Sequence, residues 1–208
     1  FYGDIVSDSW SAWTKEDQYP LNVQELLKEI GGKNISIHIN SGGGDVFAGV
    51  AICNMLRSCT GKKTVYIDGL AASIASVIAM AGDEIIMPEN AFMMIHNAWT
   101  IAMGNAADMR SLADTLDKLD GGIIATYLTR AKDGVTAEQF SAYMAAETWL
   151  TGEEAAQLFS NVKTTPALTA AASCSSTFLD RYKVPQGYTT LLTPKKPDSV
   201  MVPDDLKN

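Results

Sequence analysis

The chain has 208 residues, of which 47% are hydrophobic and 19% are charged, and its formal net charge at pH 7 is -8. This length and composition predict one folded domain with a substantial core and exclude a disordered chain. The acidic balance argues against a nucleic-acid partner, because contacts with phosphates need clustered Lys and Arg side chains.

The first quarter of the chain alternates between predicted strands and helices. Residues 1–6 are expected to form a short strand, and the apolar spacing over residues 21–30 predicts a helix. Residues 34–40 read NISIHIN, in which isoleucines alternate with polar residues, and this period of two predicts a strand. A second helix is expected over residues 45–57.

The same alternation continues through the middle of the chain. Residues 64–68 predict a strand, Gly69 begins a turn, and residues 72–80 are expected to form a helix. Two more short strands are predicted over residues 84–87 and 92–95. The second of them is wholly apolar, which indicates burial on both faces.

A long helix is predicted over residues 106–132, where apolar residues recur every three or four positions. This stripe consists of Met109, Leu112, Leu116, Leu119 and Ile123. Gly121 and Gly122 lower the helix propensity by roughly 1 kcal/mol each relative to Ala and would allow a kink. Two later helices are expected to begin at capping-box pairs, Thr136 with Gln139 and Thr151 with Glu154.

The domain division follows from a change of character near residue 163. Residues 1–163 are expected to form one domain that includes the long helix, at about residues 104–132. Residues 164–208, in which prolines recur without periodicity, are expected to form an extended C-terminal tail. The order of strands and helices predicts an α/β fold with parallel strands and right-handed crossovers. In such folds functional residues gather in the loops after the strands.

The first of these loops reads NSGGG over residues 40–44. Glycines allow a sharp turn and a close backbone approach, and their amides near the start of a helix can hold an anion, including a transient oxyanion. The alternative is a flexible turn or a phosphate cradle, although the chain lacks the Lys-Ser/Thr pair of a P-loop here. The loop on its own does not decide between these uses.

Ser73 stands in the second loop, among small residues that read GLAASIA. A hydroxyl at a strand-to-helix turn would be exposed, with the amide of Ile74 directed toward the same space. The alternative is that Ser73 simply caps the following helix, which is a common role for Ser. Ser76, one turn further on, is expected to pack inside the helix.

The chain has two His residues, and they occupy different settings. His38 alternates with isoleucines within a predicted strand, which indicates a structural role. His96 follows an apolar strand, where a general base could act on a nearby Ser. Such a base needs a carboxylate that orients its ring. The candidate acids are Asp108, Asp114, Asp117, Glu138 and Glu147, of which Glu147 differs in having apolar neighbours.

The three cysteines, Cys53, Cys59 and Cys174, are too few and too widely spaced for a disulfide framework or a metal site. We therefore expect no cofactor and no metal, and a reducing, cytoplasmic setting. No apolar run approaches the roughly 20 residues of a membrane-spanning helix, so no membrane partner is expected.

Together, these segments resemble the ClpP family of serine peptidases over residues 1–159. INSGGG at residues 39–44 is similar to the family's INSPGG, and GLAAS at residues 69–73 is similar to its GQAAS. MIHNA at residues 94–98 resembles MIHQP. ETWLTGEEA at residues 147–155 resembles the segment in which an acid precedes an aromatic residue, a small capping residue and EA. Four motifs in the same order make the resemblance specific.

The resemblance implies a set of catalytic roles. Ser73 would be the nucleophile, His96 the general base and Glu147 the third triad member. The amides of Gly44 and Ile74 would donate hydrogen bonds to the oxyanion, and Gly43 would shape the loop. The family usually has Asp where this chain has Glu147, whose side chain is one methylene longer. A structure that accommodates this acid must therefore place its backbone differently.

The resemblance also implies a fold and an assembly. The fold would be the ClpP/crotonase-type superhelix of ββα units, with the long helix as a protruding handle that packs ring against ring. A ring-shaped homo-oligomer would enclose the active sites and cleave protein or peptide substrates through an acyl-enzyme. Whether an ATPase partner supplies the substrates is left open. Gly42 replaces the family's Pro, and Asn97 replaces its Gln. These two changes and the tail look more like the ClpP-like proteases of tailed-phage head maturation, which would act in the host cytoplasm.

Two other functions remain open from the sequence. A crotonase-like acyl-CoA enzyme would use a similar backbone oxyanion hole without needing a Ser–His pair. A non-catalytic ring or assembly subunit would explain the Glu at the acid position and the unusual tail. Dependence of turnover on Ser73 separates both from the peptidase.

Overall fold

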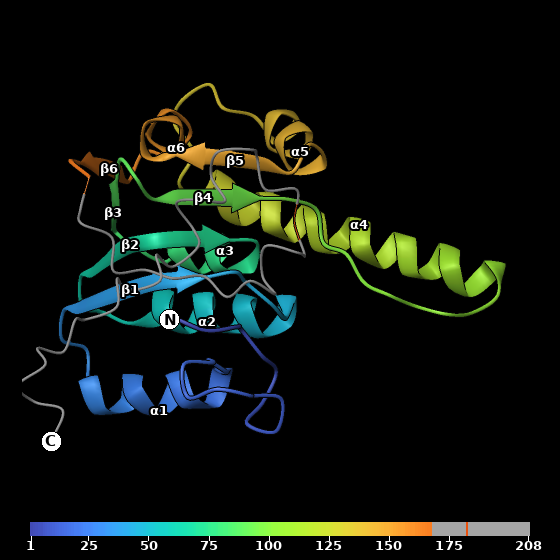
Figure 1. Cartoon of the computed structure of the whole chain (residues 1–208), viewed down its shortest axis with the longest axis horizontal. Coiled ribbons are helices and arrows are strands. Elements are labelled where there is room, and N and C mark those ends of the chain that lie inside the picture. The colour runs from blue at the N-terminus through green and yellow to red at the C-terminus, as the bar shows by residue number, and fades with distance from the viewer. Residues whose placement is uncertain (168–181, 183–208) are drawn as a thin grey trace, which may run out of the picture.

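The computed structural model describes residues 1–167 and residue 182. Within this part of the chain the helices are α1 (Pro20–Ile30), α2 (Val46–Ser58), α3 (Ile74–Ala79), α4 (Ala106–Leu128), α5 (Ala137–Ala145) and α6 (Gly152–Leu158). The strands are β1 (Ile35–Ser41), β2 (Lys63–Ala72), β3 (Glu84–Pro88), β4 (Phe92–Ile95), β5 (Thr148–Thr151) and β6 (Val162–Thr165). The mixed α/β architecture expected from the sequence is confirmed (Figure 1).

The sheet is organised around β2, which is hydrogen-bonded to three other strands. β1 runs parallel to it, from Ile35 opposite Lys63 to Ser41 opposite Ala71. β3 pairs in parallel with the first half of β2, and β4 pairs in parallel with the second half. β6 extends the sheet beyond β3 in parallel, whereas β5 is antiparallel to β4. The loops after β1, β2 and β4 therefore open at one end of the sheet.

The main core lies where α2 and α3 pack on the sheet. The whole of α3 is buried, and Ile39 of β1 and Ile67 of β2 are fully buried in the same cluster. A smaller apolar cluster, formed by Leu70, Ala72, Phe92 and Met94, belongs to β2 and β4. Trp149 and Tyr182 pack against this cluster. Alternate residues of β2 thus serve two separate apolar layers.

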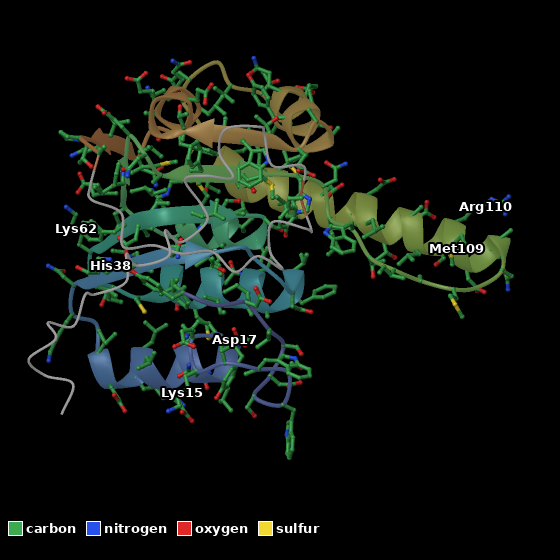
Figure 2. The ribbon with its side chains drawn as sticks, viewed as in Figure 1. Lys15, Asp17, His38, Lys62, Met109 and Arg110 are labelled. Atoms are coloured by element: carbon green, nitrogen blue, oxygen red, sulfur yellow. The ribbon has the colours of Figure 1, made fainter. Side chains whose placement is uncertain are left out.

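α4 projects from the body of the molecule, as Figures 1 and 2 show, with Met109 and Arg110 near its distant end. A capping box between Asn105 and Asp108 starts this helix. It runs without interruption past Gly121 and Gly122, so the helix accommodates both glycines, and it ends at Leu128, before the expected residue 132. The two capping boxes predicted for later helices, at Thr136 and Thr151, are confirmed.

Several predicted boundaries were wrong. Residues 1–6 contain no strand, and only Ile5 forms isolated bridges, with Gln18 and Gly44. The turn expected at Gly69 is absent, because β2 continues through this glycine and pairs with β1 and β4 as far as Ala72. β5 and β6 were not predicted from the sequence.

The expected tail begins inside the described region and then leaves it. β6 spans the expected boundary at residue 163, and residues 168–181 and 183–208 lie outside the described residues, as does Cys174. Cys53 is buried and Cys59 is half-buried, and both are free thiols. In residues 1–167 no helix is long and apolar enough to cross a membrane.

Candidate active site

Ser73 is the residue that links β2 to α3. Its backbone lies at φ 55° and ψ −130°, which is unusual for a residue with a side chain and indicates a turn held by its surroundings. The Ser73 amide donates to the carbonyl oxygen of Met94 at 2.9 Å. The Ser73 hydroxyl does not cap α3. The Ser73 hydroxyl therefore does not have the helix-capping role that the sequence left open.

Two buried hydroxyl groups, in a chain of hydrogen bonds, support the turn at Ser73. The Ser76 hydroxyl donates to the carbonyl oxygen of Ser73 at 2.5 Å. Its oxygen also lies 2.8 Å from the hydroxyl of Tyr127, a fully buried residue of α4. Ser76 thus packs inside the helix as expected, and it connects the turn to the base of α4.

His96 follows directly after β4, and its ring reaches the Ser73 hydroxyl. The His96 Nε2 atom and the Ser73 Oγ atom are 2.7 Å apart. Burial of the imidazole lowers the His96 pKa from its usual value, and the negative charge of Glu147 opposes this shift. The ring is therefore largely neutral near pH 7, and a neutral imidazole can accept a proton from a hydroxyl.

Glu147 is placed beside His96 by the pairing of β4 with β5. Ile95 lies opposite Thr148 in this antiparallel pair, so the preceding residue, Glu147, falls next to His96. Glu147 has a positive φ of 51°, which is uncommon for a residue with a side chain. Of the five acids considered from the sequence, Glu147 is the one whose charge acts on the His96 pKa in the described part of the chain.

The glycine loop packs directly against the Ser73 turn. Gly43 has a φ of 92°, and a Cβ atom there would lie 2.7 Å from the Ser73 Cβ and 3.1 Å from the Ile74 amide nitrogen. The loop is fixed by hydrogen bonds from Ile5 N to Gly43 O and from Asp45 N to Ile5 O, and by the Ser41 hydroxyl, which accepts from Gly43 N. The Gly44 amide takes part in none of these bonds.

A cavity of about 230 Å³ opens at this junction, and Ser73, His96 and Gly44 contribute to its lining. The other lining residues are Val46, Ala98, Trp99 and Tyr182. The geometry thus brings together the Ser, the His and the glycine loop, with Ile74 following Ser73 and Glu147 beside His96.

Sequence reasoning missed two residues at the site. Asp120 of α4 accepts a hydrogen bond from the Ala98 amide at 2.7 Å and so ties the segment after His96 to the long helix. Tyr182 lies against His96, with the two ring centres 5.2 Å apart and the planes at 90°. Asp120 directly follows Leu119 of the apolar stripe, and no motif in the sequence marks it as a site residue. Nothing near Tyr182 in the sequence indicates a site.

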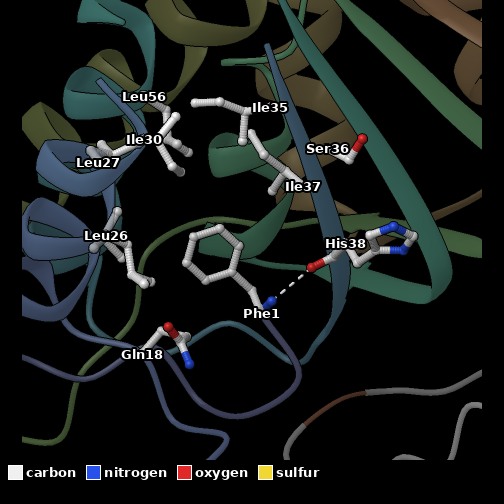
Figure 3. Close-up of a pocket in the computed structure, with 11 residues that line it drawn as sticks. Phe1, Gln18, Leu26, Leu27, Ile30, Ile35, Ser36, Ile37, His38 and Leu56 are labelled. Carbon is white, nitrogen blue, oxygen red and sulfur yellow. Dashed lines mark hydrogen bonds between the residues drawn. The ribbon is translucent and has the colours of Figure 1, made fainter. Parts of the chain in front are cut away.

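A second pocket, of about 210 Å³, lies between α1 and β1 (Figure 3). Its walls are mainly apolar side chains, and Phe1 reaches across it, with its amino group bonded to the carbonyl oxygen of His38. The His38 ring pairs with Asp68 at 2.8 Å and stacks on Tyr66, so it has a structural partner as expected. Within the described residues no cluster of His, Cys, Asp and Glu could hold a metal ion.

Comparison with known proteins finds relatives among proteolytic subunits of ATP-dependent Clp proteases. The chain is 35% identical over 130 residues to an ATP-dependent Clp protease proteolytic subunit of Bacteroides fragilis, which covers 60% of each chain. It is 32% identical over 132 residues to proteolytic subunit 1 of Protochlamydia amoebophila, covering 60% of this chain and 61% of that protein. It is 29% identical over 150 residues to the subunit of Porphyromonas gingivalis, covering 68% and 66%.

The chain therefore spans about 60% of the length of the first of these curated relatives. The profile of the Clp protease family matches residues 19–158, which include β1 to β5 and all the residues of the site except Tyr182. The mixed sheet with its projecting helix is the ClpP-type fold expected from the sequence. The chain belongs to the Clp protease family.

Proposed function

We propose that the chain is a serine endopeptidase in which Ser73 is the nucleophile and His96 the general base. The observation that carries this proposal is the 2.7 Å separation between the Ser73 Oγ and the His96 Nε2 atoms. A hydroxyl at this distance from a neutral imidazole can transfer its proton as it attacks a carbonyl carbon. Glu147 is the proposed third member, because its charge favours the imidazolium that forms.

The proposed reaction has two halves. In the first, Ser73 Oγ attacks the peptide carbonyl and His96 takes its proton. The C–N bond then breaks, His96 returns the proton to the leaving amine, and an acyl-enzyme remains. In the second half water attacks the ester with His96 as base, which releases the acid and restores the Ser73 hydroxyl.

The oxyanion of each tetrahedral intermediate needs hydrogen-bond donors. The proposed donors are the backbone amides of Gly44 and Ile74. Support for this pair comes from Gly43, whose missing Cβ allows the glycine loop to approach within contact of the Ile74 amide. Donors fixed before the reaction stabilise the developing charge at little cost of reorganisation.

Labelling of the nucleophile tests the proposal. A fluorophosphonate probe should attach to the full-length chain at Ser73, as peptide mapping of the labelled protein would reveal, and Ser73→Ala should abolish both labelling and peptide hydrolysis. Ser9→Ala is a matched control, since Ser9 is exposed in a turn. Hydrolysis that persists in Ser73→Ala would contradict the proposal. A thioester-processing function would not require the Ser73–His96 contact, which is why the peptidase is favoured over it.

We also propose that α4 mediates assembly into a ring whose active sites face an enclosed chamber. The support is the projection of α4 from the body and the partial exposure of its apolar residues, with Met109 exposed to 37% and Leu128 to 39%. An apolar stripe on a projecting helix is stabilised when another subunit covers it. The proposed substrates are proteins or peptides that can enter such a chamber, with or without an ATPase that delivers them.

The biological setting is proposed from the departures from the family pattern. Gly42 and Asn97 replace Pro and Gln, and these changes look more like tailed-phage head proteases. A capsid-assembly protein is the corresponding substrate, in the host cytoplasm. Cleavage of such a protein by the purified chain, and its loss in Ser73→Ala, would test this assignment.

A further inference from the structure

Tyr182 lies in the cavity that holds Ser73 and His96, although it is distant from both in the sequence. Its ring meets the His96 ring edge to face, at 5.2 Å between centres and 90° between planes. Its hydroxyl donates a hydrogen bond to the carbonyl oxygen of Gly42 at 3.1 Å. The side chain therefore contacts both the proposed base and the proposed oxyanion loop.

The Tyr182 ring also packs on the smaller apolar cluster of β2 and β4, which consists of Leu70, Ala72, Phe92 and Met94. An aromatic ring on an apolar surface, with its hydroxyl bonded to a backbone carbonyl, combines area burial with directional recognition. A side chain of a bound peptide would use the same two kinds of contact. The cavity is thus built in a way that suits an aromatic occupant.

The family fold does not need this occupant. The match to the Clp protease family ends at residue 158, and the Ser73–His96 contact, the glycine loop and β5 are complete without Tyr182. Tyr182 therefore lines the cavity in addition to the residues that fall within the family match. What it covers is the space next to Ser73, which a substrate must enter.

We propose that Tyr182 is an internal occupant of the substrate cleft and that it competes with peptide substrates for the space beside Ser73. The inference rests on the proposed peptidase function. A cleft that is closed for part of the time binds substrate more weakly, in proportion to the fraction of molecules in which it is open. Removing the occupant lowers the apparent KM and leaves kcat unchanged, because the catalytic groups themselves are intact.

The test compares Tyr182→Ala, Tyr182→Phe and the matched control Tyr188→Ala, the next tyrosine along the chain, in the full-length protein. With a fluorogenic peptide, Tyr182→Ala should lower KM roughly tenfold, the combined effect of an aromatic contact and a hydrogen bond. Tyr182→Phe, which keeps the ring and loses the bond to Gly42, should lower KM by a smaller factor. Tyr188→Ala should behave like the wild type. A KM that is unchanged or raised in Tyr182→Ala would overturn the proposal.

A binding measurement decides the question without turnover. A fluorescein-labelled synthetic peptide of residues 177–187, TFLDRYKVPQG, should bind Tyr182→Ala more tightly than it binds the wild type by fluorescence polarisation. The same peptide with Ala in place of the tyrosine should bind neither protein. Equal binding of the first peptide to wild type and variant would overturn internal occupancy. Absence of Ser73 labelling in every variant would instead count against the peptidase, so the two failures are distinguishable.

Discussion

The carbonyl oxygen of Ser73 accepts a hydrogen bond from the hydroxyl of Ser76, one turn further along α3, at 2.5 Å. This bond closes the first turn of a six-residue helix beneath the nucleophile. Because the Ser76 oxygen also lies 2.8 Å from the Tyr127 hydroxyl, the nucleophile turn and α4 share one buried polar contact. The turn at Ser73 is therefore supported by a residue that is itself fully buried.

Ser76→Ala should destabilise the fold and slow the reaction of Ser73. The change leaves the buried Tyr127 hydroxyl without its partner, which costs about 1–3 kcal/mol of the free energy of unfolding. Urea unfolding and the rate of fluorophosphonate labelling measure the two effects. Tyr127→Phe is the matched control, since it removes the hydroxyl itself and should cost less. A Ser76→Ala variant as stable and as reactive as the wild type would refute this role.

Gly43→Ala should slow the labelling of Ser73. An alanine Cβ would lie 2.7 Å from the Ser73 Cβ and 2.8 Å from the Ala72 carbonyl oxygen, so the loop must move away from the nucleophile. We expect a loss of at least about tenfold in labelling rate, equal to 1.36 kcal/mol. In Gly121→Ala no atom lies within 4 Å of the new Cβ, and this control should raise stability by about 0.5–1 kcal/mol. Full reactivity of Gly43→Ala would show that the loop does not form the oxyanion hole.

The pH dependence of kcat/KM should follow the titration of His96. Burial lowers the His96 pKa, so activity should rise with pH through a midpoint below the usual 6.5. Glu147→Gln removes the charge that opposes this shift, so the midpoint should move to still lower pH. The plateau should fall roughly 100-fold or more, because the imidazolium loses its stabilising partner.

Glu138→Gln is the control for this experiment, because Glu138 is exposed on α5 and its charge is not among the causes of the His96 shift. Its pH profile should overlay that of the wild type. A midpoint that moves upward in Glu147→Gln would mean that Glu147 does not act on the imidazole as inferred. An unchanged plateau would remove Glu147 from the proposed triad.

Asp120 should act as a positioning residue for the segment after His96. Its carboxylate accepts the Ala98 amide at 2.7 Å, while burial and the charge of Asp117 raise the Asp120 pKa. Asp120→Ala should lower kcat severalfold with little change in KM, because the substrate contacts remain. Asp120→Asn keeps an acceptor oxygen and should restore kcat. Equal losses in both variants would argue against positioning through this hydrogen bond.

Leu112→Glu should dissociate the proposed ring. Leu112 is half-buried on the apolar stripe of α4, whereas the neighbouring Ser111 is exposed, so Ser111→Glu is a control of equal charge. Light scattering with size-exclusion chromatography should give a smaller mass for Leu112→Glu alone. A wild-type chain that is monomeric at high concentration would contradict assembly through this helix.

Much of the fold could be predicted from the sequence because its periodicities are clear. The alternating isoleucines predicted β1, and the spacing of Met109 and the leucines after it predicted α4. β5 was missed because TWLT is short and follows a helix, and its pairing with β4 is a long-range contact. Gly69 was misread as a turn because local propensity favours one, whereas two neighbouring strands hold this segment extended.

The candidate site was predictable where its residues follow strand ends, as Ser73 and His96 do. Geometry then added what no local pattern contains: the bond from Ala98 to Asp120 and the packing of Tyr182 against His96 join residues that are far apart in the sequence. Such contacts depend on the folded arrangement and carry no period or motif. Glu147 was expected from its apolar neighbours and from the motif resemblance, and the pairing of Ile95 with Thr148 brings it next to His96.

The triple pairing of β2 has a consequence for how this protein can vary. β2 pairs with β1, which precedes the glycine loop, and with β4, which precedes His96, and β2 itself leads into the turn at Ser73. A slip of β2 by one residue would reverse which of its side chains face each apolar layer and would displace the reacting atoms together. Sequence changes at the distant end of α4, near Met109 and Arg110, are free of this constraint because those residues are exposed and far from the strands.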